Sequence, residues 1–283
     1  MASFLTAIQT IVQHYNHVLD NGSGHANRMN AMGVGLESFI KDAFADSFEL
    51  SEESKIKRYA DFFSYLGNQN NPPDMMLRGG DAIEVKKIER LNNALALNSS
   101  YPKEKLFADS PMITDDCRHC EAWQEKDLIY AIGTVENKIR LQHLWLIYGD
   151  CFVAKAAIYE RIKTTISTGI HEIADVEFSE TNELGKVKKV DPLGITDLRI
   201  RGMWSIQNPT KIFANTHPIT LDSSFQLSCL LTEHKFQSFS AEEQASILSM
   251  ESQQFTIRNV SIQNPNNPAQ LVAAKLICFK ALS

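Results

Sequence analysis

The sequence predicts an α/β fold in which helices flank a mixed central sheet. Amphipathic helical segments come first, a hairpin with a glycine turn follows at residues 74–87, and apolar strand-like runs then alternate with helices. The chain has 283 residues, of which 43% are hydrophobic and 22% charged, as in an ordinary folded protein. We expect one domain over residues 1–283, with N-terminal helices at 1–65, a core at about 66–170 and a further region at about 171–283.

Three helices are expected before the hairpin. Apolar residues recur every three or four positions from Met1 to Tyr15, which predicts an amphipathic helix. A second helix is expected from about residue 31 to 48, and Ser51 with two following glutamates begins a third that reaches about Tyr65. The stretch 66–73 contains two prolines and three asparagines, so we expect no regular structure there.

Strands and helices are expected to alternate in the rest of the chain. Two strand-like runs, 74–78 and 81–87, flank Gly79-Gly80 and predict the hairpin. Apolar runs predict strands at 128–135 and 141–152, followed by a helix at 154–167. A strand at 198–204 comes after a basic, turn-rich stretch. The C-terminal third is expected to form a strand at 225–231, a helix at 241–250 and a strand at 255–262, while 269–282 is ambiguous between helix and strand.

Charge and cysteine content limit the possible functions. Lys and Arg number 28 against 34 Asp and Glu, a net charge of −6, which argues against coating nucleic acid by bulk charge but allows a basic cleft on an acidic body. No apolar run has the length of a membrane span, and no signal peptide is visible. Five cysteines suggest reduced, cytoplasmic thiols. Cys117 and Cys120 form a lone CxxC, which we interpret as plain thiols rather than a zinc site.

The residues Pro73-Asp74 and Glu84-Val85-Lys86 form the pattern most relevant to chemistry. Glu84 and Lys86 lie roughly 7 Å apart on one face of a strand, whereas Val85 points into the core. The glycine turn folds Asp74 back beside them, so two carboxylates and an amine converge at the edge of a sheet. Two carboxylates joined by the Val85 main-chain carbonyl and waters would form a Mg²⁺ site that supports phosphodiester hydrolysis, with Lys86 beside the attacking water.

A surface hairpin with an ordinary Glu–Lys pair is the plainer interpretation, because the short motif occurs by chance in many proteins. Three features favour a nuclease: the Pro-Pro entry fixes the strand, two glycines close the turn, and most neighbours are uncharged. By strand parity, Asp81 is expected to face away from Glu84.

The arrangement resembles the core of the PD-(D/E)xK nucleases, and four longer blocks are similar to the type II restriction endonucleases of the NgoPII kind. The blocks are Leu66–Glu89, Leu97–Lys103, Trp123–Tyr130 and Asp191–Trp204. The resemblance implies a Mg²⁺-dependent homodimer that cuts double-stranded DNA within a short palindrome, GGCC, in the bacterial cytoplasm. It also implies a cognate DNA methyltransferase as a functional partner. Residues 66–170 would then be the catalytic core, and 171–283 the DNA-recognition and C-terminal region.

The resemblance also implies roles for single residues. Asp74 and Glu84 match the metal ligands and Lys86 the catalytic lysine. Many PD-(D/E)xK nucleases place a glutamate on a helix before this core, and Glu37 has that position. It would bind a second metal or orient a water, and an ordinary solvated helix residue is the alternative.

Arg199 and Arg201 are the leading candidates for reading bases, because guanine O6 and N7 suit a bidentate arginine. Residues 185–211 hold six basic and two acidic residues, a local charge of +4. The other candidates for DNA contact are Lys186, Lys188 and Lys189 for phosphates, and Asn70 and Asn71 for a groove or a phosphate. A solvated basic loop is the alternative for the charged stretch.

Two rival functions remain at this point. One is a repair or structure-specific nuclease with the same core, which would cut without a palindromic preference. The other is a non-catalytic DNA-binding protein of the same fold, against which the complete Asp–Glu–Lys set argues. The surface used for dimerisation is not fixed by the sequence, and the N-terminal helices are one candidate.

Overall fold

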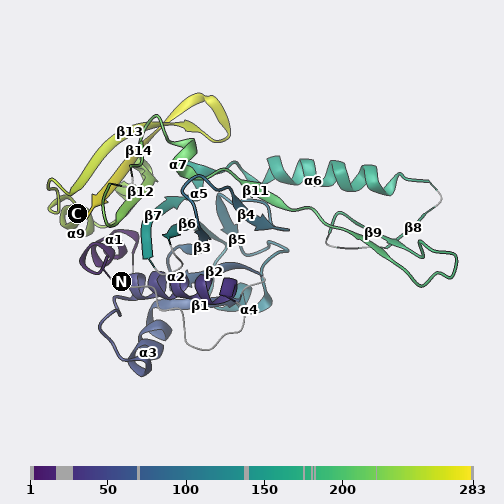
Figure 1. Cartoon of the computed structure of the whole chain (residues 1–283), viewed down its shortest axis with the longest axis horizontal. Coiled ribbons are helices and arrows are strands. Elements are labelled where there is room, and N and C mark those ends of the chain that lie inside the picture. The colour runs from purple at the N-terminus through teal and green to yellow at the C-terminus, as the bar shows by residue number, and fades with distance from the viewer. Residues whose placement is uncertain are drawn as a thin grey trace.

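The main sheet is mixed and runs in the order β1-β2-β3-β6-β7-β12-β14-β13 (Figure 1). The computed structural model describes residues 3–16, 28–68, 71–136, 140–174, 176–179, 181, 183–220 and 222–281. The strands are β1 (Phe63–Asn68), β2 (Asn71–Leu77), β3 (Ala82–Ile88), β6 (Glu125–Glu136), β7 (Arg140–Tyr148), β12 (Gln226–Thr232), β13 (Phe255–Asn264) and β14 (Asn267–Lys280). β3 pairs parallel with β6 and β7 with β12, while the other neighbours are antiparallel, which confirms the predicted α/β class.

Helices cover one face of this sheet. The N-terminal helices are α1 (Phe4–Gln13), α2 (Arg28–Ala45) and α3 (Glu52–Phe62), and the C-terminal ones are α8 (Glu233–Ser238) and α9 (Ala241–Leu248). Buried residues of α1 and α2 share one core cluster with alternate residues of the strands, such as Ile83 and Leu144. Gly133 of β6 permits this close approach, because a Cβ there would lie 2.7 Å from Leu36 Cδ2 of α2. The apolar residues of α1 are thus used inside the subunit.

Short elements cover the other face. They are β4 (Leu95–Asn98), β5 (Lys105–Phe107), α4 (Asp115–His119), α5 (Gly149–Phe152), β11 (Trp204–Ile206) and α7 (Pro209–Ile212). A second core cluster joins them to strand residues of opposite parity, including Met76, Ala82 and Tyr130. β5 pairs antiparallel with the first residues of β6, and β4 pairs with β11. The face that carries Ala82 also carries Glu84, because the two residues are one strand period apart.

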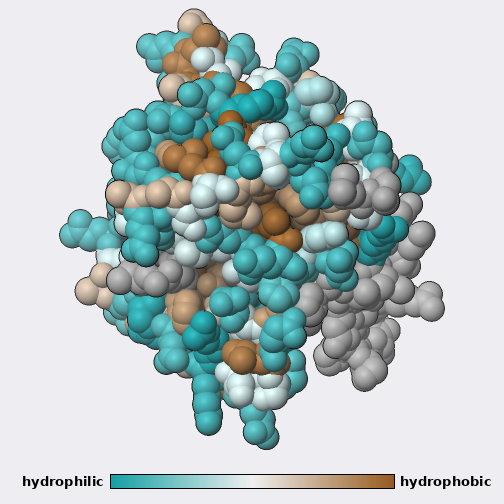
Figure 2. Space-filling model, turned by 90° about the vertical axis from the view of Figure 1, so that its left-hand side faces the viewer, coloured by the Kyte–Doolittle hydropathy of each residue, from teal (hydrophilic) through white to brown (hydrophobic). Residues whose placement is uncertain are grey.

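An arm extends away from the sheet, at the right of Figure 1. It consists of α6 (Ala156–His171) and the antiparallel strands β8 (Glu177–Phe178), β9 (Gly185–Lys188) and β10 (Leu198–Ile200). Three aromatic residues hold its base: the Tyr101 ring stacks on Tyr159 of α6 at 5.7 Å, and Trp204 meets both edge-on. The opposite end of the molecule is mostly hydrophilic, with hydrophobic residues in separate small groups (Figure 2). No helix in the described part of the chain is long and apolar enough to cross a membrane.

Several local predictions were wrong. The stretch 66–73 is not irregular, because β1 ends at Asn68 and β2 begins at Asn71, and the third helix stops at Phe62. The prolines are tolerated at the start of β2, where a register shift interrupts its pairing with β1. The hairpin is not at the sheet edge, since β3 lies between β2 and β6.

Two predicted strands also differ in extent. The run 141–152 ends as a strand at Tyr148 and continues as α5, where a Cβ on Gly149 would lie 2.3 Å from the Glu104 carbonyl oxygen. The run 198–204 divides between β10 in the arm and β11 beside β4, because each half pairs with a different strand. The ambiguous C-terminal segment is the long strand β14.

Candidate active site

The end of the β2–β3 hairpin brings Asp74, Glu84 and Lys86 together. Ladder pairing between the strands includes Met75 with Ile83 and Met76 with Ala82. Beyond Met75 a side-chain bond replaces the main-chain pairing: the Asp74 Oδ2 accepts a hydrogen bond of 2.6 Å from the Val85 N–H. Lys86 Nζ donates to Glu84 Oε1 at 2.5 Å, so the three side chains form one group. The sequence prediction that these residues converge is therefore correct in geometry.

Pro73 affects which main-chain oxygen can act as a ligand at this site. The β2–β3 ladder ends at Met75 and Ile83. Continued by two more residues, it would set Pro73 opposite Val85, where a residue with an N–H would donate to the Val85 carbonyl. Proline has no N–H and cannot donate this bond, which favours the Val85 carbonyl as a ligand.

The electrostatics of the group suit a cation. Burial and, after it, the neighbouring Glu84 charge raise the pKa of Asp74 to about 7, against the lowering effects of the Lys86 charge and the Val85 N–H. Burial lowers the pKa of Lys86, but the charges of Glu84 and Asp74 outweigh it and hold the pKa above its usual value. Among the described residues, Glu84 Oε2 is buried and has no hydrogen-bond partner. An unpartnered buried carboxylate oxygen is costly unless a ligand satisfies it.

These residues fit a hard divalent cation. Such ions bind through carboxylate and carbonyl oxygens and keep several waters. Within the described ranges no three His, Cys, Asp or Glu side chains converge on one point, and the two carboxylates that meet here are those of Asp74 and Glu84. Asp81 lies elsewhere, as expected: its carboxylate accepts from Tyr148 Oη at 2.6 Å and Lys235 Nζ at 2.8 Å.

Glu37 of α2 lies at the margin of the group. Its charge contributes to raising the pKa of both Asp74 and Lys86, as the weakest of the named influences. Its carboxylate forms an ion pair of 2.7 Å with Lys41, one turn along α2. Glu37 is therefore near the site but is not bonded to its members.

Lys103 is a further charged residue at this site that the sequence prediction missed. It is only 7% exposed, its Nζ donates to Ser100 Oγ and the Tyr101 carbonyl, and it lies 5.1 Å from the centre of the Tyr101 ring. Tyr130, the register partner of Glu84, bonds both the N–H and the carbonyl of Lys103. Burial and the Lys86 charge lower the pKa of Lys103 to about 8, while the Glu84 charge opposes them.

Sequence reasoning missed Lys103 because nothing in its local spacing links it to Glu84. It stands 17 positions after Lys86 in an irregular segment, and only the fold brings the two together. The one available signal was its place in the block Leu97–Lys103. Among the described residues no carboxylate forms an ion pair with Lys103.

The candidates for DNA contact lie mainly on the arm, where carboxylates pair with them. Glu183 accepts two bonds from Arg199, at 2.9 and 3.1 Å, and one from Arg201 at 2.6 Å. Lys186 pairs with Asp197, while Lys188 and Lys189 pair with Glu177. The local positive charge inferred from sequence is thus offset by neighbouring acids, two of which lie outside the stretch 185–211.

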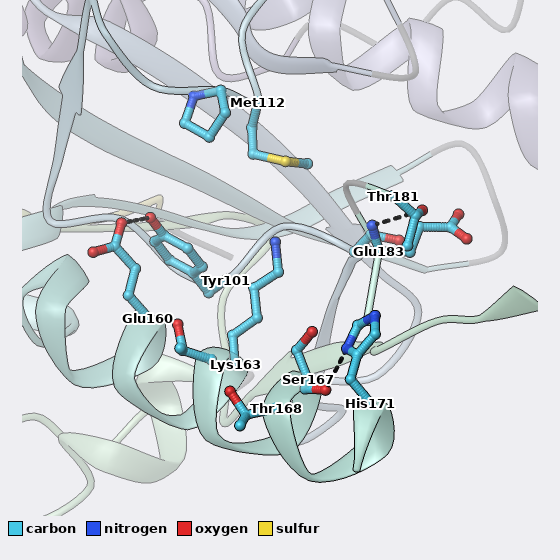
Figure 3. Close-up of a pocket in the computed structure, with 12 residues that line it drawn as sticks. Tyr101, Met112, Glu160, Lys163, Ser167, Thr168, His171, Thr181 and Glu183 are labelled. Atoms are coloured by element: carbon cyan, nitrogen blue, oxygen red, sulfur yellow. Dashed lines mark hydrogen bonds between the residues drawn. The ribbon is translucent and has the colours of Figure 1, made fainter. Parts of the chain in front are cut away.

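A cleft of about 650 Å³ separates α6 from the loops beside β4 (Figure 3). Lys163 of α6 extends into it between Tyr101 and Glu183, and Tyr101 Oη donates to Glu160 Oε1 at 2.7 Å. An adjoining hollow of about 240 Å³ is lined by Asn71 and Arg201, among others. Asn71 also donates to the Met112 carbonyl, and Asn70 lies outside the described residues.

Comparison with known proteins identifies the family of this chain. The family model for the NgoPII restriction endonuclease matches residues 2–263. The type II restriction enzyme NgoPII of Neisseria gonorrhoeae is 45% identical over 278 residues, which cover 97% of this chain and 99% of that protein. No solved structure matches the chain. The match is nearly end to end and includes the hairpin, the cleft and the arm, and on this ground the chain belongs to the NgoPII restriction endonuclease family.

Proposed function

We propose that this protein is a Mg²⁺-dependent type II restriction endonuclease that cuts double-stranded DNA at GGCC. The observation that carries the metal assignment is the half-buried Asp74–Glu84 pair, with a buried, unpartnered carboxylate oxygen at Glu84. The family supports restriction of DNA, and the name of its gonococcal member is that of a type II restriction enzyme. The target GGCC is proposed from the sequence blocks that resemble this family.

Asp74, Glu84 and the Val85 carbonyl would hold the ion. When bound, Mg²⁺ supplies charge neutralisation at the phosphodiester and lowers the pKa of a coordinated water. In the metal-free site the charges of Glu84 and Asp74 raise the pKa of Lys86. Lys86 would orient the attacking water and stabilise the phosphate beside the ion. Glu37, held by Lys41, would orient a further water.

The arm would supply DNA contacts. On binding DNA, Arg199 and Arg201 would release Glu183 and bind guanine edges. The lysines of the arm would likewise release their acidic partners and bind phosphates; they are Lys186, Lys188 and Lys189. Asn70 and Asn71 would contact DNA near the start of β2. We propose one endonuclease domain over residues 1–283 that acts as a homodimer in the bacterial cytoplasm, with a methyltransferase of the same specificity protecting the host genome.

Metal binding is tested without activity. The thermal unfolding midpoint of the protein is measured with and without Mg²⁺ or Ca²⁺, and we expect both ions to raise it. Glu84→Ala should lose this rise, whereas Asp109→Asn, at an exposed carboxylate, should keep it. A rise retained by Glu84→Ala contradicts the metal assignment.

Cleavage is tested on plasmid DNA with Mg²⁺, followed by sequencing of the ends. Discrete fragments that end within GGCC are expected, and Glu84→Ala should abolish them while still binding cognate DNA. A smear without shared ends favours the repair nuclease, and intact DNA favours the non-catalytic protein. Discrete ends at another palindrome overturn only the proposed target.

A further inference from the structure

The helix α6 carries an exposed row of isoleucines. Ile158, Ile162 and Ile166 recur every four residues and are 40–46% exposed, and Ile173, just beyond the helix, is 54% exposed. Residues spaced by four lie on one side of a helix, so these side chains form a single apolar stripe. A stripe of this kind on a projecting helix is typical of a binding surface.

No described part of the chain covers this stripe. Gly169 lies in the same row, and a Cβ placed on it would meet nothing within 4 Å. The other side of α6 is already used: Ser167 donates to the Leu184 carbonyl, and Glu160, Lys163 and His171 line the cleft. The stripe therefore faces away from the cleft, with a small residue that permits another helix to approach closely.

Two charged residues beside the stripe indicate what kind of partner binds it. Arg161 and Glu172 flank the stripe on the same edge of the helix, eleven positions apart, and both are exposed. Neither side chain has a partner among the described residues. Glu172 is the C-cap residue, where a negative charge opposes the helix dipole, so a cation from outside would offset this cost.

These charges match a second copy of the same helix in antiparallel orientation. When two antiparallel helices pack, equal edges meet, so Arg161 of one copy lies beside Glu172 of the other, twice per pair. The midpoint between the two positions falls beside Ile166, at the centre of the stripe. A parallel pair would bring opposite edges of the two helices together, so Arg161 of one copy would not meet Glu172 of the other.

We propose that α6 pairs antiparallel with α6 of a second copy around a two-fold axis near Ile166. The inference rests on the proposed homodimer and gives it a location. The N-terminal helix α1 is less suited, because its apolar residues are buried in the subunit. The proposed pair places the two clefts on either side of one axis, as a palindromic duplex requires.

The first test changes the apolar stripe. Wild type and Ile162→Glu are compared by sedimentation at equal concentrations without DNA. Wild type should be a dimer and Ile162→Glu a monomer, because the introduced charges would be buried within the contact, one turn from its centre. Ile56→Glu is the matched control, since Ile56 of α3 is 69% exposed and lies outside the stripe. Because Ile162 is exposed, its variant should fold and unfold like wild type.

The second test exchanges the charges. Arg161→Glu and Glu172→Arg should each weaken the dimer about tenfold or more, because each creates two like-charge contacts. The double variant should restore the wild-type dissociation constant, which a merely structural role of either residue would not predict. Unchanged association in both single variants, or failure of the double variant to restore it, overturns the proposed pairing.

The outcomes separate this interface from the proposed function. If Ile162→Glu stays dimeric and still cleaves, the interface is wrong and the restriction function stands. If wild type is monomeric at every concentration and cleaves without DNA-induced association, both the interface and the homodimer are wrong. If the dimer forms as proposed but DNA stays intact, the nuclease assignment alone fails.

Discussion

At the residue scale, the main feature is that the catalytic candidates are half-buried before any ligand arrives. Lys86 bonds Glu84 directly and acts on Asp74 through its charge, Lys103 interacts with Glu84 at longer range, and one carboxylate oxygen of Glu84 has no partner among the described residues. Such a group costs folding free energy that surface carboxylates do not. The residues were predictable from spacing because the hairpin is a local structure. Lys103 was not, because its position depends on bonds from Tyr130 across the sheet.

Asp74→Asn should stabilise the metal-free protein at pH 8. The pKa of Asp74 is raised to about 7 in the folded state, so ionising it costs the folded protein as pH rises from about 4 through 7. Asparagine removes that charge, and the gain should vanish near pH 4, where the wild-type carboxyl is protonated. Denaturant unfolding at both pH values measures this. A lower stability of Asp74→Asn at pH 8 would contradict the raised pKa, and Asp109→Asn serves as the exposed control.

Lys103→Met should lower kcat on the order of a hundredfold without weakening DNA binding, because a positive charge near Glu84 is lost. Lys103→Arg should retain most activity. Stability distinguishes this role from a structural one: Lys103 has no carboxylate partner among the described residues and bonds only Ser100 Oγ and the Tyr101 carbonyl, so Lys103→Met should destabilise the fold less than loss of an ion-paired lysine. Lys126, equally buried, pairs with Glu121 and bonds the Gly80 carbonyl, so Lys126→Met should destabilise it. Unchanged kcat in Lys103→Met would remove Lys103 from the active site.

At the element scale, segments with regular apolar spacing were predicted well, and segments that contain Pro or Gly or change from one element to another were predicted poorly. The helix α9 and the strands β6, β12 and β13 follow from their apolar spacing. The limits of β2, α5 and β11 do not, because distant partners decide them. β11 exists as a strand only because β4 lies beside it, and α5 begins where Gly149 contacts the Glu104 backbone. Contacts between residues so far apart in sequence leave no local pattern.

Gly149→Ala should therefore destabilise the protein by about 1–3 kcal/mol, since the added methyl meets a backbone oxygen that cannot rotate away. It should also reduce activity, because the displaced segment carries Lys103. In the monomeric Ile162→Glu background, Gly169→Ala on α6 should instead be neutral or stabilising, as nothing in the same subunit lies within 4 Å and alanine favours helix. Denaturant unfolding of both variants gives the comparison, and equal stabilities would refute the contact.

At the scale of the whole molecule, an acidic protein is proposed to bind DNA through an arm whose cations are already paired. Glu177 and Glu183 together occupy four of the five basic candidates. Non-cognate DNA has only its phosphates to offer in exchange, so binding to it should be weak. Cognate DNA adds base contacts and can displace the carboxylates.

Glu183→Gln should tighten binding to non-cognate DNA and lower the preference for GGCC, because Arg199 and Arg201 lose their partner. Binding should also weaken more steeply with salt, since more phosphates are neutralised. Fluorescence anisotropy from about 50 to about 200 mM salt measures both effects. If affinity for non-cognate DNA is unchanged, the arm does not carry the phosphate contacts.

The position of Tyr101 links the arm to the group around Glu84. Its hydroxyl bonds Glu160 on the arm, and the face of its ring lies against the Lys103 amine. One side chain thus spans the distance between the part expected to sense DNA and the part expected to hydrolyse it. Any tilt of the arm that breaks the Glu160 bond would free the ring and alter the charge around Glu84. The protein would then discriminate between DNA sequences through the rate of phosphodiester cleavage as well as through the fraction of protein that has DNA bound.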